Sequence, residues 1–203
     1  MMSTKTIFKL QLPTDPLWVK NVVESNIEEI LTDHAYCEQK AATNAITLII
    51  QNPNISELVQ EMAQLVQEEM DHFKRVHAII LKRGYILGQE RKDNYVNELI
   101  KFLKRGGGEQ KRTESMVDRL LLAAMIEARS CERFKVLAQH INDEELAVFY
   151  HELMISEATH YTLFIGLARK YGEGIDVEKR WQEWLDYEGQ IIKDYAKAEG
   201  IHG

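Results

Sequence analysis

The 203-residue sequence has few cysteines and no long hydrophobic run. Its two cysteines, Cys37 and Cys131, are too few for a disulfide framework, so we expect reduced, buried thiols in a cytoplasmic protein. No apolar run approaches the length of about 20 residues that spans a bilayer. Residues 1–16 also lack the apolar stretch and small-residue cleavage site of a signal peptide. These absences predict a protein with no membrane segment.

Positive charge is also scarce, with 25 Lys and Arg against 32 Asp and Glu and a net charge of −7. This balance excludes a basic footprint over the whole surface, although it leaves room for a local basic patch. Proline occurs three times, and 45% of the residues are hydrophobic. Such a composition is typical of a globular domain, and the length suffices for one well-buried core.

The chain consists mostly of long stretches rich in Ala, Leu, Glu, Lys and Gln, which favour helix, separated by a few turn signals. Alternation of period two is absent, so we expect no strands. The breaks predict four long helices, at about 25–50, 55–82, 114–140 and 143–170, and shorter helices at about 15–23, 93–103 and 177–198. Trp181, Trp184 and Tyr187 recur at spacings of three and should pack an aromatic edge of the last helix against the others.

The connections between these helices predict the fold class. Very short turns join the first and the last pair of long helices, so each pair should form an antiparallel hairpin. A crossover of about 30 residues connects the two hairpins, as in ferritin-like folds. We therefore predict an all-α, ferritin-like four-helix bundle that forms a single domain over residues 1–203, with the bundle at about 25–170.

Each long helix has an apolar stripe that is interrupted once by a glutamate, at Glu38, Glu69, Glu127 and Glu157. An unpaired charge facing the core would cost at least several kcal/mol, so something must compensate it. In the second and fourth helices a histidine follows three residues later, at His72 and His160, on the same helix face. A third such pair, Glu199 and His202, lies beyond the helical pattern and is interpreted as chance.

The spacing of these residues from the predicted turns places them at matching depth. Glu38 and Glu69 lie 14 and 16 residues from the first turn, and Glu127 and Glu157 lie 14 and 15 residues from the second. With a rise of about 1.5 Å per residue, each hairpin sets its two glutamates side by side. Two such hairpins would close six ligands around one centre, which is the arrangement of di-iron and di-manganese carboxylate sites: Glu38, Glu69, His72, Glu127, Glu157 and His160.

The charges of the six groups predict the metal. Four carboxylates and two imidazoles carry a charge of about −4, which two divalent cations would balance. Mixed oxygen and nitrogen ligands suit iron or manganese rather than metals that prefer thiolates. The competing interpretation, a metal-free helical interaction protein with buried ion pairs, requires basic residues on the same stripes, and none occurs at these heights.

Residues next to the six ligands have more ordinary interpretations. Glu132 lies about 140° round the helix from Glu127, so we expect it to pair with Arg129 or Arg133. Asp71 either orients a ligand or is simply solvated. His34, one turn before Glu38, either contacts a ligand or is a satisfied core histidine.

Three segments resemble signature stretches of a known family, namely 33–42 (DHAYCEQKAA), 127–134 (EARSCERF) and 156–161 (SEATHY), together with 12–19 (LPTDPLWV). The family is that of the tRNA 2-methylthio-N6-isopentenyladenosine hydroxylases, the MiaE family, and the resemblance extends over residues 10–198. It implies an O2-dependent mono-oxygenase with two iron ions that hydroxylates the isopentenyl group at tRNA position 37. It also implies that the six ligands hold the iron, with Glu69 and Glu157 bridging.

The resemblance further implies partners. A mono-oxygenase needs two electrons, and no flavin or nicotinamide fingerprint is present, so we expect an external reductase or a ferredoxin-like donor. A tRNA substrate needs phosphate contacts, for which the glycine-rich crossover offers Lys104, Arg105, Lys111 and Arg112; the alternative is an ordinary solvated linker. We expect a monomer or a weak dimer. The alternative function is a ferritin-like iron oxidase or storage protein, or another di-iron or di-manganese oxidase.

Overall fold

The structure is a computed structural model that describes residues 7–104 and 109–199, apart from the side chains of 109–111 and 195–199. Within these ranges all regular structure is helical and no strand occurs, which confirms the predicted all-α class. No helix in the described part of the chain has both the length and the apolar character that crossing a bilayer requires.

The helices lie close to their predicted positions. The long ones are α1 (Ile27–Gln51), α2 (Ser56–Lys82), α4 (Glu109–His140) and α5 (Glu144–Tyr171), and α3 (Asn94–Ile100) and α6 (Val177–Glu199) complete the set together with the short η1 (Ile7–Lys9) and η2 (Val19–Val23). Helix α4 begins five residues earlier than predicted, because the Glu, Gln, Lys and Arg residues directly after the glycine run are strong helix formers.

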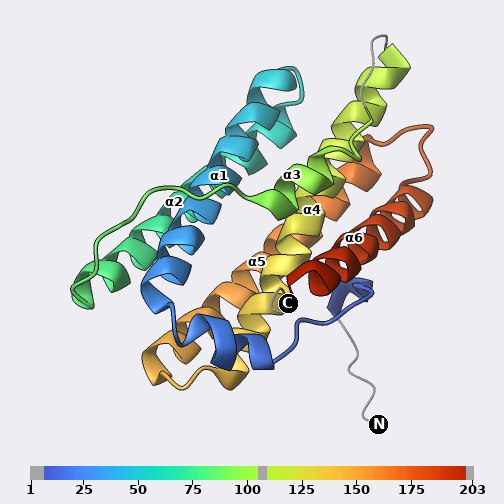
Figure 1. Cartoon of the computed structure of the whole chain (residues 1–203). Coiled ribbons are helices and arrows are strands. Elements are labelled where there is room, and N and C mark those ends of the chain that lie inside the picture. Colours follow the sequence, from blue (N-terminus) through green and yellow to red (C-terminus); the bar gives the residue numbers. More distant parts are fainter. Residues whose placement is uncertain (1–6, 105–108, 200–203) are drawn as a thin grey trace. The chain divides into compact units, whose positions relative to one another are not determined.

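The chain divides into two compact units. One unit, Ser25–Lys92, contains α1 and α2 and is called here the α1–α2 unit. The other combines the residues up to Glu24 with those from Asp93 onwards and is called the α4–α6 unit. Figure 1 labels the helices of both units. The single domain expected from the sequence stays a prediction.

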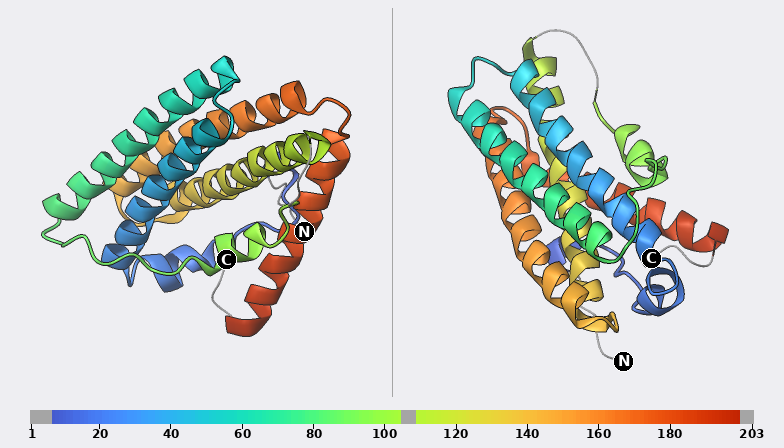
Figure 2. Two further views of the ribbon diagram at one scale, coloured as in Figure 1. Left: turned by 90° about the horizontal axis from the view of Figure 1, so that it is seen from above. Right: turned by 90° about the vertical axis from the view of Figure 1, so that its left-hand side faces the viewer.

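The α1–α2 unit is an antiparallel hairpin, as predicted (Figures 1 and 2). Its apolar stripes are buried, among them Leu31, Ala35, Ala42, Ala45 and Leu48 of α1 and Leu58, Met62, Leu65, Val76 and Ile80 of α2. After α2, Gly84 adopts a φ of +73°, a conformation that favours glycine, and the chain then turns back toward α1. There Tyr36 Oη donates a hydrogen bond of 3.0 Å to the Gly88 carbonyl.

In the α4–α6 unit, α4 and α5 form the second predicted antiparallel hairpin (Figure 2). Asp143 caps α5, because its carboxylate accepts a hydrogen bond from the Leu146 amide at 3.0 Å. Helix α6 contacts α4, and Trp184 of α6 is fully buried, with its ring 5.0 Å from that of Phe102. The ring of Tyr187 stacks on that of Phe102 at 4.3 Å. The aromatic edge predicted for the last helix is thereby confirmed.

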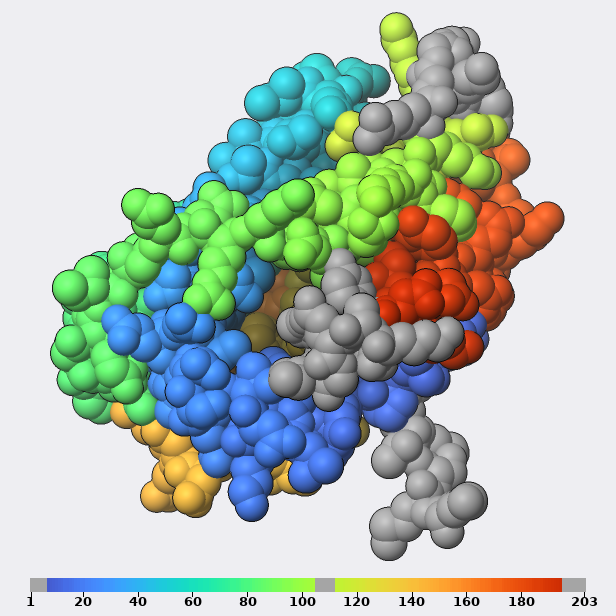
Figure 3. Space-filling view, viewed as in Figure 1, coloured from blue at the N-terminus to red at the C-terminus, as the bar shows by residue number. Residues whose placement is uncertain are grey.

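The second half of the crossover is fixed within the α4–α6 unit by a buried ion pair. Arg180 of α6 donates to both carboxylate oxygens of Asp118 in α4, at 2.8 and 2.7 Å. The same pair holds the backbone just after α3, because Arg180 donates to the Phe102 carbonyl and Asp118 accepts from the Lys104 amide. As a result α3 lies against α4 and α6, and the surfaces of α3, in green, and α6, in red, adjoin in Figure 3.

Candidate metal centre

Three of the six predicted ligands meet inside the α1–α2 hairpin. Glu38 of α1 and Glu69 and His72 of α2 are 4%, 1% and 7% exposed. One potential ligand atom from each lies within 4.8 Å of the other two. His72 Nδ1 is 3.6 Å from a Glu69 oxygen and 3.8 Å from a Glu38 oxygen. The prediction that the turn sets these residues at equal depth is confirmed within this hairpin.

The electrostatics of this group suit a bound cation. Burial would lower the pKa of His72, but its contacts with Glu38 and Glu69 outweigh burial and raise the pKa to about 10. Burial would likewise raise the pKa of Glu38, but hydrogen bonds with His34 and His72 outweigh it and hold that pKa well below its usual range. The position between the carboxylates therefore stabilises positive charge strongly. Two carboxylates and one neutral imidazole also balance the charge of one divalent ion.

His34 is part of this group. Its Nε2 lies 2.6 Å from Oε1 of Glu38, four residues further along α1, and its side chain is 6% exposed. Of the two interpretations left open by the sequence, the structure favours contact with a predicted ligand over a plain core histidine.

The other three predicted ligands meet inside the α4–α5 hairpin. Glu127, Glu157 and His160 are 4%, 3% and 2% exposed. A Glu127 oxygen and a His160 ring nitrogen lie within 4.8 Å of each other, and His160 Nδ1 is 3.9 Å from Oε1 of Glu157. This hairpin thus repeats the donor set of the first, with oxygen and nitrogen donors that fit iron or manganese. Closure of all six ligands around one centre stays a prediction.

A buried charged network surrounds Arg129, two residues after Glu127. Arg129 lies 2.6 Å from Glu188 of α6 and 3.2 Å from Glu132, which confirms the predicted pairing of Glu132. It also donates to the Leu12 carbonyl at 3.0 Å, and Glu132 accepts from the amide of Thr14 at 2.8 Å. The network therefore ties the N-terminal segment, α4 and α6 together inside one unit.

Sequence analysis missed Glu188, the acidic partner that makes this network possible. It lies on α6 and is 0% exposed. Its position four residues after Trp184 places it on the same helical stripe, so the signal that located Glu38 in α1 could also have located Glu188.

Two residues next to the predicted α1–α2 ligands, Asp71 and Cys37, point away from them. Asp71 is exposed and pairs with Lys74 at 3.2 Å, which favours the solvated alternative over an orienting contact with a ligand. Cys37 is exposed rather than buried. Each residue directly precedes a buried ligand, and a step of one residue turns a helix by about 100°, which carries both side chains to the outer face. Cys131, by contrast, is buried and donates to the Met154 carbonyl at 3.1 Å.

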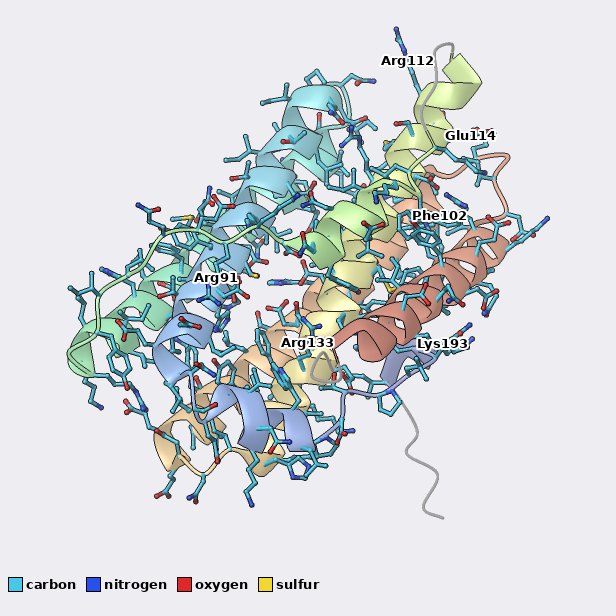
Figure 4. The ribbon with its side chains drawn as sticks, in the orientation of Figure 1. Arg91, Phe102, Arg112, Glu114, Arg133 and Lys193 are labelled. Carbon is cyan, nitrogen blue, oxygen red and sulfur yellow. The ribbon has the colours of Figure 1, made fainter. Side chains whose placement is uncertain are left out.

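The predicted substrate-binding residues are only partly described. Lys104 and Arg112 are exposed, and Figure 4 shows Arg112 projecting from the first turn of α4. Arg105 and the side chain of Lys111 lie outside the described residues. The two described side chains are accessible to a large polyanion, so their role stays open as a prediction.

Comparison with known proteins gives concordant matches. Residues 1–203 match the family described as tRNA-(MS[2]IO[6]A)-hydroxylase (MiaE). The tRNA 2-(methylsulfanyl)-N(6)-isopentenyladenosine(37) hydroxylase of Pseudomonas putida is 36% identical over 170 residues, covering 84% of this chain and 80% of that protein. The protein of the same name from Salmonella typhimurium is 26% identical over 231 residues, covering 90% and 83%.

A solved structure supports the fold. "Protein 43 with aldehyde deformylating oxygenase activity from Synechococcus" is similar with a TM-score of 0.80 and 31% identity, covering 90% of this chain and 88% of that one. The predicted ferritin-like class is thereby confirmed.

Proposed function

Because the chain belongs to the MiaE family of tRNA hydroxylases, we propose that it hydroxylates the isopentenyl group of 2-methylthio-N6-isopentenyladenosine at position 37 of tRNA. The observation that carries the proposal is the family match over the full length. The Pseudomonas and Salmonella relatives, both named for this substrate, support it. The ferritin-like storage protein is not favoured, since neither relative is named for storage. A tRNA substrate also implies that the enzyme acts in the cytoplasm.

We propose that the six predicted ligands hold two iron ions. Each hairpin contributes two buried carboxylates and one buried imidazole, which is the charge needed for one divalent ion. Oxygen and nitrogen donors alone would also accept manganese, and the preference for iron comes from the proposed reaction. When bound, the pair of ions would supply the activation of O2 for insertion into a C–H bond.

The protein groups have separate tasks in this proposal. Glu38 and Glu127 would each hold one ion, and Glu69 and Glu157, each followed by a histidine on the same helix face, would be the carboxylates shared between the ions. His72 would hold the metal through a neutral ring, so a protonated His72 would have to release its proton on metal binding. All six side chains are at most 7% exposed, which keeps bulk water away from the reaction.

Two further components have to come from outside the chain. We propose that an external reductase or ferredoxin-like protein delivers the two electrons that reduction of O2 requires. The substrate is held by its phosphates, for which Lys104 and Arg112, on either side of the glycine run in the sequence, are exposed. The modified base then has to leave its stack to reach a buried centre.

The test is incubation of the reduced, iron-loaded chain with labelled O2 and tRNA that carries the isopentenylated nucleoside. Mass analysis of the digested tRNA should show one added oxygen atom, derived from O2 rather than from water. Glu157→Ala should abolish this product, whereas Asp71→Ala, which removes an exposed carboxylate beside a ligand, should retain it.

An unchanged nucleoside mass with a metal-loaded protein would defeat the substrate assignment. Conversion of an aldehyde in a parallel incubation would then point to the activity in the name of the Synechococcus protein.

A further inference from the structure

The two hairpins carry the same ligand pattern, but only one has a histidine one turn before its first glutamate. We propose that the two halves of the metal centre are unequal, and that the α1–α2 half binds its ion more tightly because His34 holds the Glu38 carboxylate in place. The inference rests on the proposed metal-dependent function and concerns His34 as a positioning residue.

The contact between His34 and Glu38 has a defined direction. An ionised carboxylate only accepts hydrogen bonds, so His34 must donate from Nε2 across the 2.6 Å to Oε1 of Glu38. The second oxygen, Oε2, is the one that lies 3.8 Å from His72 Nδ1. His34 therefore occupies one carboxylate oxygen and leaves the other directed at the remaining ligands of the hairpin.

This contact lowers the cost of binding a metal. A glutamate side chain that is already fixed loses less conformational freedom when it takes up an ion. Both side chains are buried, so water does not compete for the hydrogen bond. Hydrogen-bond partners of metal ligands typically change metal affinity by about 10- to 100-fold.

The corresponding position of the other hairpin has different chemistry. Four residues before Glu127 lies Ala123, which is 2% exposed and has no side-chain donor. The nearest buried cation along α4, Arg129, is engaged by Glu188 and Glu132. At the position one turn before the first glutamate, α1 therefore offers an imidazole and α4 does not.

Calorimetric titration of the metal-free, full-length chain with Co2+ tests the proposal without turnover. The wild type should bind two ions in two phases whose affinities differ at least tenfold. His34→Ala should weaken the tighter phase by about 10- to 100-fold. His34→Gln should recover part of that loss, because the amide can still donate a hydrogen bond.

Two controls separate positioning from general stability. His77→Ala removes a half-buried histidine of α2 that stacks on Phe73, so it should leave both phases unchanged. In a Glu38→Ala background, adding His34→Ala should have no further effect on Co2+ affinity, since the residue that it positions is gone. A merely structural role for His34 would lower the melting temperature of the metal-free chain and leave the titration as it was.

Two equal phases, an unaltered titration in His34→Ala, or no Co2+ binding would each overturn the inference. The experiment separates the inference from the proposed function. If Co2+ binds in two unequal phases but tRNA stays unmodified, the inference holds and the proposed function is wrong. If tRNA is hydroxylated but the two phases are equal, the proposed function holds and the inference is wrong.

Discussion

The two hairpins resemble each other in their ligands and differ in what their neighbouring residues do. In the α1–α2 unit the residue one turn from Glu38 is His34, which contacts that ligand at 2.6 Å. In the α4–α6 unit the charged residue nearest to Glu127 along the helix is Arg129, which instead contacts Glu188 and Glu132. In the first hairpin the neighbouring residue therefore contacts a predicted metal ligand directly, whereas in the second the buried charge holds helices of the same unit together.

This difference teaches that a repeated ligand pattern does not imply a repeated environment. A substitution close to the ligands of the α1–α2 unit should change metal affinity, and a comparable one in the α4–α6 unit should change folding stability. The three predictions below test whether the two units are as different as their neighbouring residues indicate.

The largest expected difference concerns the cysteines, because each hairpin has one close to a predicted ligand. Cys37 is exposed, while burial raises the pKa of the Cys131 thiol to about 12. At pH 8, about one Cys131 thiol in 10,000 is then ionised, and only the thiolate reacts with alkylating agents. The native protein should therefore accept a single label, at Cys37, in peptide mass analysis.

Unfolding in urea should expose the second thiol and yield two labels. Rapid labelling of Cys131 in the native chain would contradict the burial on which this comparison depends.

The next largest effect is expected from Arg129→Met. The substitution leaves Glu188, which is 0% exposed, and Glu132 as buried charges without their arginine, and such a change costs about 3–5 kcal/mol. Urea unfolding followed by circular dichroism measures the loss. Lys74→Ala, which breaks the exposed pair with Asp71 in the other unit, should cost less than about 1 kcal/mol.

Arg129→Met should be partly rescued by Glu188→Gln, because the second substitution removes one of the stranded charges. Equal losses for the Arg129 and Lys74 variants would show that the buried network contributes no more than a surface ion pair.

Local periodicity was sufficient to predict much of this fold and of the candidate site. The apolar stripes located the long helices, and the glutamates that interrupt them are buried at matching depth within each hairpin. These features depend on residues three, four or about thirty positions apart within one hairpin, where helix geometry converts spacing directly into position.

Contacts between distant segments could not be obtained in this way. Glu188, the partner of Arg129, lies 59 residues further along the chain, on α6. The amide that donates a hydrogen bond to Glu132 belongs to Thr14, in the N-terminal segment. The orientation of single residues also failed where one position decided it, as for Cys37, which turns outward beside the inward-facing Glu38. For His34, the spacing of four residues placed it on the same helix face as Glu38. The 2.6 Å contact between the two side chains could be seen only in the structure.

The smallest effect is expected at the surface, where the two units differ in their proposed contact with tRNA. Lys104 and Arg112 of the α4–α6 unit are exposed, and each phosphate contact with a single strand contributes about 0.7 to the slope of log affinity against log salt. Replacing both with alanine should reduce that slope by about 1 to 2 and weaken tRNA binding about tenfold near 0.15 M salt.

The matched control is the pair Lys74→Ala and Lys82→Ala, which removes two exposed lysines from α2 of the other unit and should leave the slope unchanged. Metal content should be the same in all variants, because these side chains are exposed whereas the predicted ligands are buried. If both double variants weaken tRNA binding equally, the effect comes from net charge alone. If only the Lys104 and Arg112 variant does, the α4–α6 unit combines the stabilising network with the contact to the substrate, and the α1–α2 unit is left with the better-positioned half of the metal centre.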